Sequence, residues 1–172
     1  MWWELYGLVV EYYEIFNLKP TLNLSTEELK KSYQALQKQY HPDRFIHASA
    51  ETQQKALINS SLINDAYKVL ENPVKRAQYL IECHHIKTSN QMSPTFLMQQ
   101  MELEEKLEAS LTKIVDLEKM LSEVNTAYAS RYTELENKFS NHELQSISEL
   151  MNEIIFLDKF RYKIKDTIQK IS

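Results

Sequence analysis

Glycine is almost absent from this chain, and that absence limits the folds it can adopt more than any other feature. The single glycine is Gly7, there are four prolines, and neither residue type occurs after Pro94. Few positions can therefore take the left-handed or tightly turned conformations for which glycine is the usual residue. A glycine-rich phosphate-binding loop and most β-hairpin designs are excluded, and an all-α fold is expected.

Charge and cysteine content narrow the class of protein further. The 172 residues carry 20 basic and 24 acidic side chains, a formal net charge of -4, which disfavours nucleic acid or an anionic membrane as the main partner. Cys83 has no second cysteine with which to form an internal disulfide. No apolar run approaches the about 18 residues that cross a bilayer, and the apolar opening segment lacks the basic start of a signal peptide. We therefore expect a soluble protein of a reducing compartment, the cytoplasm.

The first half of the chain predicts two long helices and a short third one. Steps of three and four residues define one apolar helix face: Leu29, Tyr33, Leu36 and Tyr40. Ser25 and Glu28 form a capping box before that face. Pro42 ends the helix, because the residue before a proline is pushed out of the α region and proline has no N–H to donate. A second helix is expected over about 50–71 and a short one over 73–82.

The second half predicts a linker followed by three helices. Residues 84–93 have no apolar period and collect Thr, Ser and Asn, so they are expected to form a linker that ends in a Ser-Pro helix start. Over 94–172 the apolar steps are helical, with a break near 109–112 and a capping box of Ser140 and Glu143 before the last helix. The expected seams contain Leu107, Leu111, Ile114, Leu117, Leu121, Val124 and Tyr128, then Ile147, Leu150, Ile154, Leu157, Ile164, Ile168 and Ile171. Such seams stabilise helices only when buried against one another, so a three-helix bundle is expected.

The tripeptide His41-Pro42-Asp43 lies in the expected loop between the two long helices. Pro42 fixes its own φ and restricts the residue before it, so the loop presents a histidine and a carboxylate with little ordering cost. A basic amphipathic helix, LKKSYQALQKQY, precedes the tripeptide, and INDAYKVL follows it. In this context residues 11–83 resemble the J-domain family, the co-chaperones that stimulate ATP hydrolysis by heat-shock ATPases of the DnaK type.

This resemblance implies that the loop and the basic helix bind the ATPase. The implied chaperone-binding residues are His41, Pro42, Asp43, Lys30, Lys38 and Arg44. The cations among them would also attract an acidic partner surface. The alternative interpretation is an ordinary helix-helix turn beside a solvated basic face. A catalytic His-Asp dyad is disfavoured because no nucleophile or metal-ligand set accompanies it, so no enzyme activity is expected.

The first bundle helix has two contrasting sides when each residue is turned by about 100°. One side, the expected seam, carries Phe96, Leu103, Leu107 and Leu111. The opposite side carries Leu97, Met98, Met101, Glu102 and Glu105. Phe156 lies about 100° off the seam of the last helix. Apolar residues that face away from a core indicate a partner surface, so Met98, Met101 and Phe156 are expected to be exposed. The alternatives are a second core contact or scattered exposed apolar residues.

A closer resemblance covers nearly the whole chain. FLMQQMELEEKL and FLDKF are similar to the C-terminal region of the HscB family, the J-type co-chaperones of iron-sulfur cluster assembly. In that family the bundle binds the scaffold protein IscU and delivers it to the ATPase HscA. The implied scaffold-binding residues are Leu97, Met98, Met101, Glu102, Glu105 and Phe156, with no catalytic residue and no cofactor. Ala109 departs from the family pattern, in which an acidic residue is usual.

Other functions fit the sequence less well. A J-domain co-chaperone for a different client is the alternative, whereas a structural coiled coil would explain residues 94–172 but not the His-Pro-Asp loop. Cys83, His84 and His85 are adjacent and cannot all face one metal ion. One acidic cluster is interpreted as a solvated face: Glu102, Glu104, Glu105 and Glu108. No metal site is expected.

Overall fold

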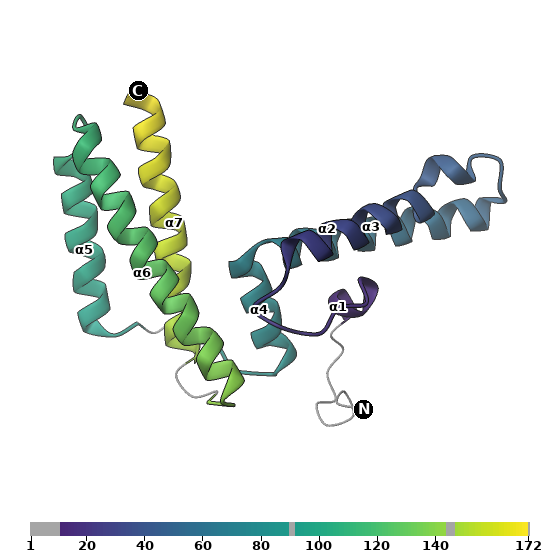
Figure 1. The fold of residues 1–172 in the computed structure, drawn as a ribbon, viewed down its shortest axis with the longest axis horizontal. Coiled ribbons are helices and arrows are strands. Elements are labelled where there is room, and N and C mark those ends of the chain that lie inside the picture. The colour runs from purple at the N-terminus through teal and green to yellow at the C-terminus, as the bar shows by residue number, and fades with distance from the viewer. Residues whose placement is uncertain (1–10, 90–91, 144–146, 172) are drawn as a thin grey trace. The chain divides into compact units, whose positions relative to one another are not determined.

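A computed structural model describes residues 11–89, 92–143 and 147–171. The opening segment, for which the sequence predicts no function, and two residues of the expected linker lie outside this described part. Every regular element within it is a helix, so the all-α prediction is confirmed. Contacts divide the chain between His85 and Ile86 into two compact units, and Figure 1 shows the helices of each. The units are described separately below.

The first unit is built around an antiparallel pair of helices. Its elements are α1 (Glu11–Ile15), α2 (Thr26–Tyr40), the short 3-10 helix η2 (Pro42–Phe45), α3 (Ala50–Glu71) and α4 (Pro73–Cys83). Helices α2 and α3 lie side by side, and η2 lies in the loop that joins them. The predicted bounds of α3 and the predicted proline start of α4 are confirmed.

Local side chains account for where these helices begin. The Ser25 hydroxyl accepts a hydrogen bond from the Glu28 N–H at 3.3 Å, as the capping box predicts. Before α4, the Asn72 side chain accepts from the Lys75 N–H at 3.0 Å, and a proline occupies the first helical position, where no N–H is needed.

Long-range contacts that the sequence did not reveal complete the first unit. Helix α1 was not predicted, and its Tyr13 is fully buried and donates a hydrogen bond to the Thr21 carbonyl at 2.8 Å. Arg76 is also buried, with 4% of its surface exposed. Its guanidinium donates to the carbonyls of Leu22 at 3.0 Å and Leu70 at 2.6 Å. A buried cation is tolerated here because backbone oxygens replace its water.

The second unit is an antiparallel three-helix bundle, as predicted. It consists of α5 (Pro94–Ala109), α6 (Ile114–Ser140) and α7 (Ile147–Ile171). Helices α6 and α7 approach each other closely along their length, whereas α5 approaches neither as closely. The buried cluster that joins all three helices consists of Leu107, Leu117, Met120, Val124, Leu157, Phe160 and Ile164.

The expected seams and one expected cap of the second unit differ in part from the sequence-based prediction. The break between α5 and α6 lies where expected, but three expected seam residues are exposed: Leu111 in this turn at 47%, Ile114 at the start of α6 at 36% and Ile171 at the end of α7 at 38%. The capping box of Ser140 and Glu143 was wrong. Ser140 is the last residue of α6, and its hydroxyl donates to the Glu136 carbonyl at 2.9 Å. Serine can make this backbone contact inside a helix as well as cap one, so its position alone was ambiguous.

The predicted linker is partly anchored to the second unit. Ser89 donates its N–H to the Ser148 hydroxyl at 2.6 Å, and its carbonyl accepts from the Asn152 amide at 2.6 Å. Further along, the Ser93 hydroxyl caps α5 by accepting from the Phe96 N–H at 3.2 Å. Local capping therefore fixes the start of α5, and Ser89 of the predicted linker contacts α7.

Candidate functional site

The His-Pro-Asp loop presents its histidine to solvent in a defined geometry. His41 ends α2 and caps η2, and its Nδ1 accepts a hydrogen bond from the Asp43 N–H at 3.3 Å. A neutral ring that accepts at Nδ1 carries its proton on Nε2. The side chains of His41 and Asp43 are 50% and 79% exposed. The loop can therefore offer a partner both a donor and a carboxylate.

Contacts at both ends hold this loop in place. On one side, the Arg44 guanidinium donates to the Lys38 carbonyl at 2.6 Å, which satisfies one of the free carbonyls at the end of α2. On the other side, the Gln53 amide donates to the carbonyls of Ile46 and Ala48, each at 3.0 Å. Sequence reasoning assigned Arg44 only to partner binding and missed Gln53. The loop is thus positioned before any partner arrives.

A basic face lies on α2 beside the loop. Lys30 and Lys38 are exposed and eight residues apart, so they share one side of the helix. Lys31 differs, because its ammonium pairs with the Glu27 carboxylate at 2.9 Å. The two lysines named by the family resemblance thus lie on the open face of α2.

Polar contacts fix α2 on α3. The Asn64 side-chain oxygen accepts from the Tyr33 hydroxyl at 2.9 Å and from the Gln37 amide at 2.8 Å. The Tyr33 ring also stacks on Tyr67 with centroids 4.0 Å apart. The Tyr67 hydroxyl donates to Glu71 at 2.8 Å, and this hydrogen bond raises the pKa of Tyr67. Asn64 was not singled out from the sequence, because its partners lie about thirty residues away.

The second candidate surface runs along α5 on the side away from the bundle core. Met98 and Met101 are each 64% exposed, and Leu97 is 46% exposed. Glu102 and Glu105 are exposed as well. We call these five residues the α5 strip. The predicted exposure of its two methionines is confirmed, and Ala109 is an exposed residue at the last position of α5.

Phe156 does not share this exposure, so that part of the prediction was wrong. Its ring is partly buried, meets the Phe96 ring edge-on at 5.7 Å and stacks on Phe160 at 5.5 Å. Phe96 and Phe160 are both buried. A helix wheel for α7 alone could not show this, because the position that is off the α6 seam faces α5. Phe156 therefore contributes to packing as well as to the surface near the start of the strip.

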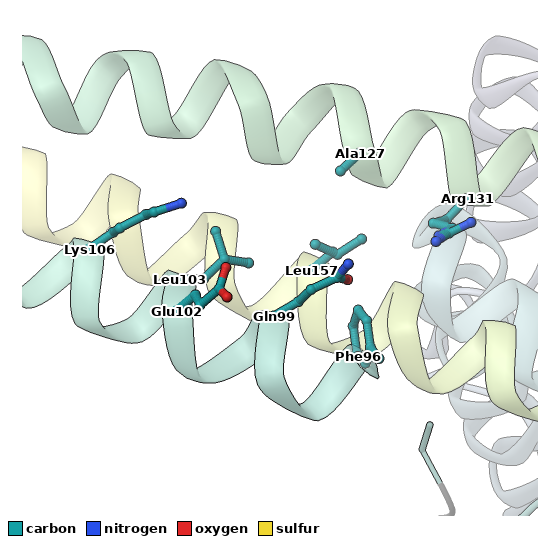
Figure 2. Close-up of a pocket in the computed structure, with 8 residues that line it drawn as sticks. All are labelled: Phe96, Gln99, Glu102, Leu103, Lys106, Ala127, Arg131 and Leu157. Atoms are coloured by element: carbon teal, nitrogen blue, oxygen red, sulfur yellow. The ribbon is translucent and has the colours of Figure 1, made fainter. Parts of the chain in front are cut away.

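A groove lies on the other flank of the strip, between α5 and α6 (Figure 2). It has a volume of about 230 Å³. Its lining residues are Phe96, Gln99, Glu102, Leu103 and Lys106 from α5, Ala127 and Arg131 from α6, and Leu157 from α7. Glu102 thus belongs to the α5 strip and to the groove. No signal in the sequence predicted the groove.

An ion pair closes one end of the groove. The Arg131 guanidinium contacts Glu153 of α7 at 2.7 Å and Glu134 of its own helix at 3.1 Å. Burial raises the pKa of the Glu153 carboxyl, and the nearby Arg131 charge only partly opposes this effect. The positive charge of Arg131 is therefore largely offset by two carboxylates within the bundle.

Comparisons with known proteins find matches to both units. Residues 11–79 match the family model of the DnaJ domain, and residues 92–165 match that of the HSCB C-terminal oligomerisation domain. A co-chaperone protein HscB homolog from Neisseria gonorrhoeae is 32% identical over 164 residues, which cover 92% of this chain and 99% of the relative. The chain belongs to the HscB co-chaperone family.

Further relatives of the HscB family agree. An HscB homolog from Colwellia psychrerythraea is 37% identical over 130 residues, covering 73% of this chain and 74% of the relative. Chaperone HscB from Vibrio cholerae superposes with a TM-score of 0.87 at 29% identity, over 94% of this chain and 99% of that one. The human co-chaperone protein HscB gives a TM-score of 0.85 at 26% identity, over 93% of this chain and 82% of that one.

The environment of Cys83 in this HscB-family chain does not favour a nucleophilic thiol. Cys83 is the buried last residue of α4, whereas His85 is exposed. Burial raises the pKa of the Cys83 thiol and raises the pKa of Tyr79 to about 12. A thiol with a raised pKa is a poor nucleophile at neutral pH.

The described residues offer neither a metal site nor a membrane span. No group of three or more His, Cys, Asp or Glu side chains is placed to hold a metal ion. None of the helices in the described part combines the length and the apolar character needed to cross a membrane.

Proposed function

We propose that this HscB-family chain stimulates the ATPase of a specialised HscA- or DnaK-type heat-shock chaperone and delivers the iron-sulfur scaffold protein IscU to it. The main support is the combination of an anchored, exposed His-Pro-Asp loop in one unit with an exposed apolar and acidic α5 strip in the other. Each surface suits a different partner. The proposed setting is the cytoplasm, with iron-sulfur cluster assembly as the process served.

The loop and the basic face of α2 are proposed to bind the ATPase. His41 and Asp43 are exposed and held by contacts at both ends of the loop, so binding orders little additional chain. Lys30 and Lys38 add a positive field that increases the rate of encounter with an acidic surface. ATP hydrolysis itself takes place in the partner.

The α5 strip is proposed to bind the scaffold. Met98 and Met101 supply flexible apolar contact area, and Glu102 and Glu105 border it with negative charge. A basic segment of the scaffold that carries apolar residues fits this arrangement. One chain that holds scaffold and ATPase together raises the effective concentration of the scaffold at the chaperone.

The test measures ATP turnover by a purified HscA-type ATPase. We expect the chain alone to stimulate turnover and the scaffold to increase that stimulation further. Met101→Ala should weaken scaffold binding by about tenfold or more, since truncation of a central contact costs about 1 to 3 kcal/mol. Stimulation without scaffold should not change, because Met101 is remote in sequence from the loop and exposed on its own helix.

Val115→Ala is the matched control, because Val115 is a 77% exposed apolar residue of the same unit outside the strip. It should bind the scaffold like the unmodified chain. Stimulation of the ATPase with no binding of the scaffold would instead favour a J-domain co-chaperone for a different client. Absence of any stimulation would contradict the proposal as a whole.

A further inference from the structure

We propose that the groove between α5 and α6 receives one apolar side chain from a basic segment of the iron-sulfur scaffold protein, next to the α5 strip (Figure 2). This inference rests on the proposed function and extends the scaffold-binding surface beyond the residues that the family resemblance names. It assigns binding to Gln99, Leu103 and Ala127, none of which was singled out for binding.

The groove has the size and lining of a side-chain pocket. Its volume of about 230 Å³ exceeds the about 150 Å³ of an apolar cavity that holds benzene. Phe96 and Leu157 are buried residues of the bundle, and Leu103 is a partly buried one, so they give the groove an apolar base. A leucine, methionine or phenylalanine side chain would fit this space, and binding there would remove its apolar surface from water.

The groove exists because Ala127 of α6 is small and faces α5, which lies at some distance from α6. In Figure 2 the side chains of Gln99 and Leu103 extend from α5 toward α6, where Ala127 offers only a methyl group. Helix α5 also approaches α6 less closely than α7 does. Ala127 is exposed, so no side chain of this unit covers it. A larger residue at this position would fill the groove from the α6 side.

The groove is lined by Glu102 and two cations, Lys106 and Arg131, so the preference for a basic segment comes from the exposed side of α5 beside it. Glu102 lines the groove and lies on the strip, and Glu105 and Glu108 are exposed on the same helix. Lys106 is the cation that α5 adds to the lining, while the charge of Arg131 is offset by Glu134 and Glu153. The exposed side of α5 is therefore acidic in excess, which favours lysines and arginines beside the inserted apolar residue.

The experiment fills the groove without replacing any residue of the strip. Ala127→Leu places a branched side chain in the groove, and Ala129→Leu adds the same atoms at an exposed position about 200° away on the same helix. Scaffold affinity is measured by calorimetry with the IscU-type scaffold, together with a thermal melt of each variant. We expect Ala127→Leu to weaken binding about tenfold or more and Ala129→Leu to leave it unchanged, as for loss of a buried anchor.

A second variant guards against a folding defect. Gln99→Phe fills the groove from the α5 wall, and it should weaken binding in the same way even where Ala127→Leu lowers the melting temperature. Normal scaffold affinity in both filled variants, together with weak scaffold binding by Met101→Ala, would overturn the assignment of the groove to scaffold binding and leave the proposed function intact. No scaffold binding by the unmodified chain would overturn both. A change in self-association of the chain alone on filling the groove would assign it to a second copy and also overturn the inference.

Discussion

The two units present their candidate binding surfaces in different ways. In the first unit the surface is a short loop and one open helix face, and His41, Asp43, Lys30 and Lys38 are all exposed and outside the core. In the second unit the surface follows a helix whose opposite side forms the core. There, exposed Met101 and partly buried Phe156 belong to one candidate site.

This difference predicts how mutations separate binding from folding. Exposed loop residues can change with little effect on stability, because Arg44 and Gln53 hold the loop backbone from both ends and the hydrogen bond that His41 itself accepts is long and exposed to solvent. A residue such as Phe156 packs on two buried rings, so any change to it alters the bundle as well. The comparison can be tested in four ways, taken from the largest expected effect to the smallest.

The largest effect is expected at the loop. His41→Gln should abolish stimulation of the ATPase while it changes the free energy of unfolding by no more than about 0.5 kcal/mol, since the side chain is exposed. Turnover assays and urea unfolding measure the two quantities. His47→Gln is the control, because His47 is an exposed histidine six residues later. Full stimulation by folded His41→Gln would remove the loop from the binding surface.

The second effect concerns Phe156, where function and folding should change together. Phe156→Ala should lower the free energy of unfolding by about 1.5 to 2.5 kcal/mol, roughly half the about 3 to 5 kcal/mol of a fully buried phenylalanine. It should also weaken scaffold binding. Urea unfolding measures the stability, with Met101→Ala as the control that loses binding only. An unchanged midpoint would show that the ring packs less than the contacts with Phe96 and Phe160 indicate.

The third effect is electrostatic and confined to the first unit. Replacing Lys30 and Lys38 with Gln should slow association with the ATPase while stimulation at saturating concentrations stays the same. For the unmodified chain, association should weaken as the Debye length falls from about 10 Å at 0.1 M salt to about 3 Å at 1 M. The double variant should depend less on salt. Equal salt dependence in both chains would identify α2 as an ordinary solvated face.

The smallest effect is a pH dependence of the free energy of unfolding, caused by Glu153 where α7 packs against α6. Burial raises the pKa of Glu153 in the folded chain, so the folded state holds this proton more tightly than the unfolded state does. The resulting stabilisation is present at low pH. It is lost as pH rises from the ordinary pKa of a glutamate, which applies to the unfolded chain, through the raised pKa of Glu153 in the folded chain. Urea unfolding from pH 4 to 7 should therefore show stability falling relative to Glu153→Gln. Parallel curves for the two chains would mean that the carboxyl is hydrated.

Much of the fold was predictable because its determinants act within one helical turn. Ser25 sets the start of α2 by accepting from the Glu28 N–H, and Pro73 suits the start of α4 because that position needs no N–H, and the structure places both helices accordingly. The scarcity of glycine predicted the all-α class, and the apolar steps predicted the bundle. The exposure of Met98 and Met101 also followed from one helix wheel.

Only the tertiary structure decided features that depend on distant neighbours. Arg76 is buried because the carbonyls of Leu22 and Leu70 meet its guanidinium, and no local pattern reports that contact. Phe156 is partly buried because α5 lies beside it, and the groove exists because Ala127 of α6 faces α5. Helix periodicity gives the direction of a side chain on its own helix but not which helix stands opposite, and that second fact determines burial.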